Sequence, residues 1–79
     1  ARYGAKYNIL VNAIAPGIVK TNLTKKEIDG SGGSNYLKMT LLKSFGRLED
    51  VSSFCIYLSS DSQKHVTGQV FNVSGGAVL

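Results

Sequence analysis

Residues 15–21, with the sequence APGIVKT, combine residue types that could bind a ligand. Pro16 fixes one backbone angle and lacks an amide donor, Gly17 lets another group approach the backbone closely, and Thr21 offers a hydroxyl four residues later. The segment follows an apolar stretch with the pattern of a buried strand, and ligands of open α/β sheets lie beyond the carboxyl ends of strands. On spacing alone the Pro-Gly pair favours an ordinary turn, and a ligand site is the alternative.

The single histidine and the single cysteine offer little further chemistry. His65 lies between a predicted helix and a predicted strand, which favours a surface or turn position over a catalytic one. No second His or Cys could complete a metal site, so we expect no bound metal. Cys55 falls on the apolar stripe of a helix, which favours a core position over a reactive thiol. One cysteine allows no internal disulfide, so we expect a reducing compartment, the cytoplasm.

Composition narrows the class of partner. Nine basic and five acidic residues give a formal net charge of +4, but the basic residues are scattered along the chain. A nucleic-acid interface usually gathers its charge on one element, so we expect no nucleic-acid partner. The longest apolar run is interrupted at Asn12 and is too short to cross a bilayer, so we expect no membrane span. Seventy-nine residues with 43% hydrophobic content suit one small unit or a piece of one.

Two strands and a helix must position the 15–21 segment. The nearly continuous apolar run from Asn8 to Ala15 predicts a strand buried on both faces. A second strand is predicted from Gln69 to Val73, with glycines before and after it. Between them, apolar residues spaced by three and four predict an amphipathic helix from Leu48 to Ser60. Its apolar stripe consists of Leu48, Val51, Cys55 and Leu58.

Residues 22–44 form the least regular stretch. The pattern predicts two short helices, from Lys25 to Asp29 and from Asn35 to Leu42, separated by the tract GSGGS at 30–34. Such a tract is typically flexible, so the stretch fits either a mobile lid or an inert linker. The order strand, irregular stretch, helix, strand is typical of the end of an α/β unit.

The predicted sheet needs further partners. Two parallel strands joined through one helix leave both sheet edges open, so we expect an N-terminal part or another chain to cover them. Phe54 and Tyr57 lie beside the predicted helical stripe and broaden it beyond what one sheet face requires. Their position predicts a second contact surface on this helix.

Three stretches carry distinctive patterns: VNAIAPGIVKT at 11–21, FGRLEDV with LSSD at 45–51 and 58–61, and VTGQVFNVSGG at 66–76. In order and spacing they resemble the C-terminal motifs of the short-chain dehydrogenase/reductase family, over nearly the whole chain. The resemblance implies the α/β fold class, with residues 1–79 as the C-terminal part of a doubly wound Rossmann-type parallel sheet. That part comprises its last two strands, the substrate-binding loop and the intervening helix.

The resemblance implies a nicotinamide cofactor, NAD or NADP, and a small alcohol or carbonyl substrate. The backbone of Pro16, Gly17 and Val19 would face the nicotinamide ring and its carboxamide, with Ile18 packing nearby. The Thr21 hydroxyl would reach the carboxamide or the pyrophosphate. These are positioning roles, because the cofactor carries the hydride.

Residues 22–44 match the family's substrate-binding loop in position, and we call them the substrate loop. Its candidate pocket residues are Leu23, Tyr36, Leu37 and Met39, for which simple packing is an equal alternative. In the family, the helix and strand that correspond to 48–60 and 69–73 commonly meet their counterparts in another subunit. The resemblance therefore implies a homodimer or a homotetramer.

The family's catalytic residues are not found in this chain. Its proton donor is a Tyr followed four positions later by a Lys, and none of the four tyrosines here has a Lys at that spacing. The glycine-rich turn that holds the pyrophosphate is absent as well, and the family's Asp before the final Gly-Gly is Ser74. We therefore expect an enzyme as the intact parent and an inactive segment on its own. The alternative is a non-catalytic interaction or assembly module derived from this fold.

Overall fold

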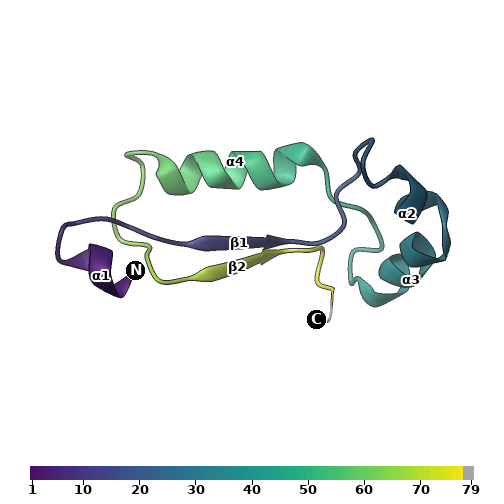
Figure 1. Cartoon of the computed structure of the whole chain (residues 1–79), viewed down its shortest axis with the longest axis horizontal. Coiled ribbons are helices and arrows are strands. Elements are labelled where there is room, and N and C mark those ends of the chain that lie inside the picture. The colour runs from purple at the N-terminus through teal and green to yellow at the C-terminus, as the bar shows by residue number, and fades with distance from the viewer. Residues whose placement is uncertain (78–79) are drawn as a thin grey trace.

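The computed structural model describes residues 1–77 as four helices and two strands. In chain order these are α1 (Arg2–Ala5), β1 (Ala13–Pro16), α2 (Lys25–Asp29), α3 (Ser31–Met39), α4 (Leu48–Ser59) and β2 (Val70–Val73). Helix α4 lies along one side of the strand pair, while α2 and α3 lie beyond the arrowheads of both strands (Figure 1). Within residues 1–77 no helix has both the length and the apolar character that a membrane span requires.

The two strands pair in parallel, from Ala13 opposite Val70 to Pro16 opposite Val73, which confirms the predicted crossover. Asn12 extends this contact with its side chain. Its Nδ2 donates to the carbonyl of Val66 at 2.9 Å, and its Oδ1 accepts from the Gln69 amide at 3.1 Å. One polar residue in an apolar run therefore fastens the start of the strand pair.

The predicted first strand was wrong in its start and its burial. Asn8 has a positive φ of 59° in the turn that ends α1, and pairing begins only at Ala13. A strand buried on both faces was expected, but Ala13 and Pro16 are exposed and Ile14 is half-buried. The physical reason is that α4 is the one layer covering the pair within residues 1–77.

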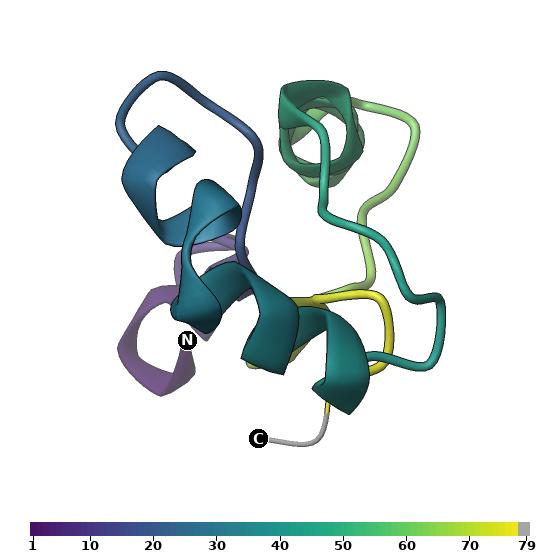
Figure 2. The ribbon, with the colours of Figure 1, turned by 90° about the vertical axis from the view of Figure 1, so that its right-hand side faces the viewer.

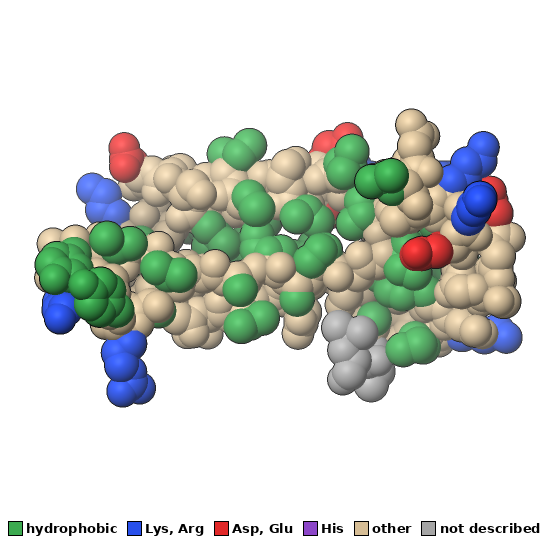
Figure 3. Space-filling view, viewed as in Figure 1, with side chains coloured by type: hydrophobic (Ala, Val, Ile, Leu, Met, Phe, Trp, Pro, Cys, Tyr) green, Lys and Arg blue, Asp and Glu red, His purple; other side chains and the backbone are tan. Residues whose placement is uncertain are grey.

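Helix α4 faces the strands with Val51, Phe54 and Leu58, all half-buried. Apolar side chains fill the band between α4 and the strands (Figure 3). The rings of Phe54 and Phe71 meet edge to face, with centroids 4.9 Å apart and planes at 87°. This aromatic pair joins the helix to β2.

The predicted stripe of α4 was wrong at two positions. Leu48 is 61% exposed and Cys55 is exposed, so neither is a core residue, whereas Phe54 faces the sheet rather than a second surface. Positions 51, 54 and 58 satisfy the helical spacing as well as 51, 55 and 58 do. The larger ring decides, because Phe54 gains more from burial than a thiol one position further around the helix.

The first helix of the substrate loop has the predicted bounds, Lys25–Asp29. The second was placed too late, because α3 begins at Ser31 and ends at Met39. The glycine tract was expected to be flexible, but only Gly30 interrupts the helices. A Cβ on Gly33 would overlap the backbone carbonyl of Ile28, so this glycine lets α2 and α3 pack closely.

Candidate functional site

The carboxyl ends of both strands point toward α2 and α3, which lie in front when the molecule is viewed from that end (Figure 2). We call residues 16–21, which leave this edge, the wall segment. Pro16 lies opposite Val73, and the Gly17 amide donates to the Val73 carbonyl at 3.0 Å. The wall segment therefore starts from a fixed point at the end of the sheet.

Gly46, just before α4, holds the middle of the wall segment. Its amide donates to the Ile18 carbonyl at 3.0 Å, and its carbonyl accepts from the Lys20 amide at 3.0 Å, which makes a parallel bridge with Val19. Neighbouring residues of an extended chain direct their backbone groups to opposite sides. The amide and carbonyl of Val19 therefore point away from Gly46.

Thr24, at the N-cap position of α2, fastens the end of the wall segment. Its hydroxyl donates to the Val19 carbonyl at 2.6 Å and accepts from the Thr21 amide at 3.0 Å. The two threonine hydroxyl oxygens lie 3.3 Å apart. Sequence reasoning missed Thr24, although a threonine directly before a predicted helix is a common capping signal.

The four candidate pocket residues of the substrate loop separate into two groups. Leu23 is 95% exposed and Met39 is 47% exposed, whereas Leu37 and Tyr36 are half-buried. Tyr36 reaches the wall segment, where it lies against Gly17. The structure therefore brings Tyr36 into the site and leaves Leu23 at the surface.

A hollow of about 320 Å³ opens beside the end of the wall segment. It is lined by Lys20, Thr21, Asn22, Lys25, Ile28 and Asp29. Neither lysine forms an ion pair within residues 1–77. Sequence reasoning did not select the two lysines, whose positions give this end of the site two positive charges and one negative charge.

Arg47 and Asp50 form an ion pair at the N-terminus of α4, directly after Gly46. Arg47 Nη2 donates to Asp50 Oδ1 and the Arg47 amide donates to Asp50 Oδ2, both at 2.8 Å. The side-chain hydrogen bond from Arg47, followed by its backbone hydrogen bond, holds the pKa of Asp50 below its ordinary value. The same pair raises the pKa of Arg47. The anionic first turn also suits the positive end of the helix dipole.

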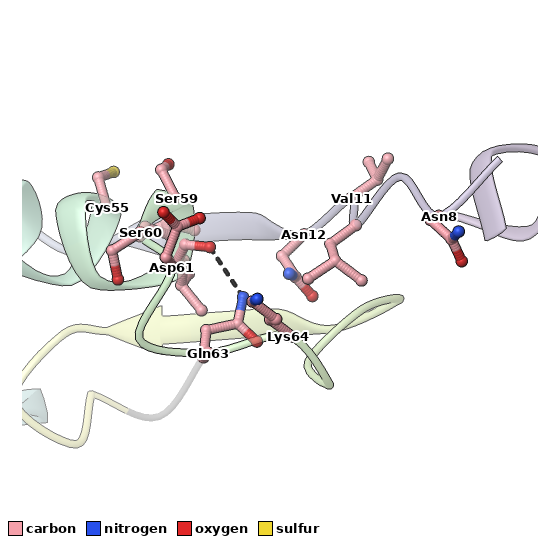
Figure 4. Close-up of a pocket in the computed structure, with 12 residues that line it drawn as sticks. Asn8, Val11, Asn12, Cys55, Ser59, Ser60, Asp61, Gln63 and Lys64 are labelled. Carbon is pink, nitrogen blue, oxygen red and sulfur yellow. Dashed lines mark hydrogen bonds between the residues drawn. The ribbon is translucent and has the colours of Figure 1, made fainter.

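A larger hollow, of about 860 Å³, lies at the opposite end of the sheet (Figure 4). It runs between the last turn of α4, with Cys55 and Ser59, and the residues leading into β1. Buried Gln63 supports it by donating to the Leu58 carbonyl at 2.8 Å and accepting from the Val66 amide at 2.9 Å. We interpret it as an open packing surface along β1. Ligands of open α/β sheets bind beyond the carboxyl ends of the strands, and this hollow lies at the opposite end.

The comparisons with known proteins agree with the motif pattern. The family model described as enoyl-(acyl carrier protein) reductase matches residues 1–78. The chain is 39% identical over 72 residues to 3-oxoacyl-[acyl-carrier-protein] reductase FabG of Thermotoga maritima, covering 91% of this chain and 29% of that protein.

Solved structures share the fold. A short-chain type dehydrogenase/reductase from Mycobacterium ulcerans superposes with a TM-score of 0.91 at 36% identity, over 96% of this chain and 28% of that one. A 4-hydroxyisoleucine dehydrogenase complexed with NADH gives a TM-score of 0.86 at 34% identity, over 96% of this chain and 32% of that one.

The chain spans about 30% of the length of the relatives it matches, 29% of the Thermotoga protein and 28% of the Mycobacterium structure. Within that share, the family-model match runs over residues 1–78, and the three motifs, the parallel crossover and the wall segment fall inside it. The chain therefore belongs to the short-chain dehydrogenase/reductase family.

Proposed function

We propose that this chain supplies the nicotinamide-side wall and the substrate loop of an NAD(P)-dependent oxidoreductase that interconverts an alcohol and a carbonyl. One observation carries the proposal. Gly46 and Thr24 hold the wall segment from two sides, so that the Val19 backbone and the Thr21 hydroxyl lie together beyond the strand ends. Fixed polar groups at that edge are what a cofactor of this class requires.

The polar groups of the wall segment suit a carboxamide. A nicotinamide carboxamide offers one carbonyl acceptor and an NH₂ donor, and the Val19 amide and the Thr21 hydroxyl can match them. Pro16 and Gly17 would lie against the ring, with Ile18 packing behind. The bound cofactor, NAD or NADP, would supply the hydride chemistry, while these residues orient it and exclude water.

The proton-transfer residues would come from the rest of the intact protein, so the 79-residue chain alone should be inactive. The experiment titrates intact protein with NADH and with NADPH by fluorescence, beside the purified segment. Binding by the intact protein, weakened about tenfold by Thr21→Val, supports the proposal, with surface variant Ser52→Ala as control. Intact protein that assembles but binds neither cofactor would favour the non-catalytic assembly module.

The proposed assembly is a homodimer or homotetramer through α4 and β2. Apolar side chains on these two elements remain exposed: Leu48 by 61%, Ile56 by 70%, Tyr57 by 48% and Val70 by 68%. Phe54 was expected at this surface, but its ring packs against Phe71 of β2 instead. Exposed apolar residues on neighbouring elements are typical of subunit interfaces.

The proposed location of the intact protein is the cytoplasm. Cys55 is the single cysteine of this chain and is an exposed free thiol, which a reducing compartment preserves.

A further inference from the structure

We propose that Tyr36 is a positioning residue that latches the substrate loop onto the wall segment. The inference rests on the proposed function, because it concerns how that loop and that wall are held together. Tyr36 lies in the middle of α3, and its hydroxyl donates to the carbonyl of Ser74 at 3.1 Å. Ser74 is only 6% exposed and follows directly on β2. The bond therefore joins the loop to the end of the sheet.

The space above Gly17 is filled by the same tyrosine. A Cβ on Gly17 would overlap the Tyr36 hydroxyl oxygen and would lie 2.9 Å from its Cζ and 3.0 Å from the Cβ of Ser74. Gly17 is not among the glycines with positive φ, which are Gly68, Gly75 and Gly76. Glycine is therefore needed at position 17 for space rather than for its backbone angle.

Phe45, in the connection between α3 and α4, supports the ring of Tyr36. The two rings stack with centroids 5.8 Å apart and planes only 8° from parallel. Phe45 directly precedes Gly46, which is bonded to Ile18 and Lys20 of the wall segment. Movement of Tyr36 would therefore disturb the wall both through Gly17 and through the Phe45–Gly46 segment.

A second bond at the end of the substrate loop has a different role. The Leu42 amide donates to the Gly75 carbonyl at 3.0 Å and so anchors the chain where it leaves the loop. Tyr36 is six positions earlier, inside the helical part of the loop. Loss of the Tyr36 hydroxyl should therefore loosen α2 and α3 while the end of the loop stays attached.

The proposed latch makes Tyr36 a contact between the loop and the sheet and not a residue that binds substrate. The Tyr36 hydroxyl is already engaged by Ser74, so it is not free to bind a substrate carbonyl. Its effect on cofactor would be indirect, through the backbone after Gly17. Tyr36→Phe keeps the ring and its stacking on Phe45 but removes the hydrogen bond, so it isolates the latch.

The experiment uses the intact protein with Tyr36→Phe, and with Tyr3→Phe as a control for loss of a phenol hydroxyl at a 74% exposed site. Two quantities are measured: the initial rate of trypsin cleavage after Lys25, Lys26 or Lys38, and the Kd for NADH and NADPH by fluorescence. Both should increase two- to tenfold in Tyr36→Phe, the range that one neutral hydrogen bond corresponds to. Tyr3→Phe should match the wild type in both.

The two readouts separate the latch from the proposed function. A wild-type cleavage rate in Tyr36→Phe would overturn the latch. Faster cleavage with unchanged cofactor Kd would make Tyr36 a structural residue and overturn its positioning role. If the wild-type protein binds neither cofactor, the proposed function fails, and the latch still stands or falls on the cleavage rate.

Discussion

The hydroxyl of Thr24 donates a 2.6 Å hydrogen bond to the carbonyl of Val19, five residues earlier. This contact ties the first residue before α2 to the middle of the wall segment. Thr24→Val should destabilise the intact protein by about 1–3 kcal/mol, because it leaves the Val19 carbonyl and the Thr21 amide without this partner. Cofactor Kd should increase about fivefold, as measured by fluorescence titration. Thr24→Ser keeps the hydroxyl and should restore most of the affinity; equal loss in both variants would assign the effect to packing.

Tyr36 and Gly17 should show strong energetic coupling. Gly17→Ala alone should cost about 1–3 kcal/mol of unfolding free energy, because its Cβ overlaps the Tyr36 hydroxyl. In a Tyr36→Ala background the same change should cost much less, and urea unfolding of the four proteins measures the difference. Gly46→Ala is the control, since its Cβ would meet its nearest neighbour at an ordinary 3.5 Å. Additive costs in the cycle would contradict the contact.

Two adjacent glycines of α3 should respond in opposite directions. Gly33→Ala should destabilise the protein by about 1–3 kcal/mol, because its Cβ has no room beside the Ile28 carbonyl. Gly32→Ala should be neutral or stabilising by up to about 1 kcal/mol, because its nearest neighbour would be 3.7 Å away and alanine favours the helix. Thermal unfolding distinguishes them. The close α2–α3 packing would be wrong if both variants behaved alike.

Asp50 should contribute to stability in a pH-dependent way. Its pKa is lower in the folded protein than in the unfolded chain, chiefly through the side-chain hydrogen bond from Arg47. The contribution is therefore complete above the unfolded pKa and is lost as the pH falls through the folded pKa. Asp50→Asn should flatten the acid limb of the stability curve, measured by urea unfolding between about pH 2 and pH 7. Glu49→Gln, which leaves the Arg47 bonds intact, should keep more of the slope, and identical curves for Asp50→Asn and wild type would rule out the effect.

Ile56→Glu should weaken the subunit contact without unfolding the protomer. Ile56 is 70% exposed on the side of α4 that faces away from Phe71, so a carboxylate there costs little in the isolated fold. In an interface it would be desolvated without a partner. Sedimentation velocity at micromolar concentration should show a smaller species, whereas Lys38→Glu on α3 should leave the mass unchanged. An unchanged oligomer in Ile56→Glu would place the interface elsewhere.

Local patterns predicted the elements whose signals are complete within a few residues. The end of α2 follows from the Gly/Ser tract after it, and the parallel pairing of the strands follows from the rules for crossover connections. The wall segment could be selected because Pro16 and Gly17 directly follow an apolar run of the sequence. These features need no knowledge of distant neighbours.

Contacts between distant residues could not be predicted in this way. Nothing in the spacing of Tyr36 and Gly17 indicates that one occupies the side-chain space of the other. The facing side of α4 was ambiguous, because Phe54 and Cys55 both fit a spacing of three or four. Burial was overestimated as well, because within residues 1–77 no hydrophobic side chain is buried. Apolar patterns report a tendency to be covered, whereas burial depends on which layers are present.

The strand pair also sets the order in which this region can be built during synthesis. Asn12 can form its hydrogen bond only after Gln69, 57 positions later, has been synthesised, and Pro16 can pair only after Val73 has been. On the ribosome the wall segment therefore emerges well before the strand that anchors it, and its apolar neighbours stay open to chaperones or to misassociation in the interval. Helices α2 and α3 depend on local contacts and can form first, so the helices of the substrate loop should be in place before the wall segment is anchored.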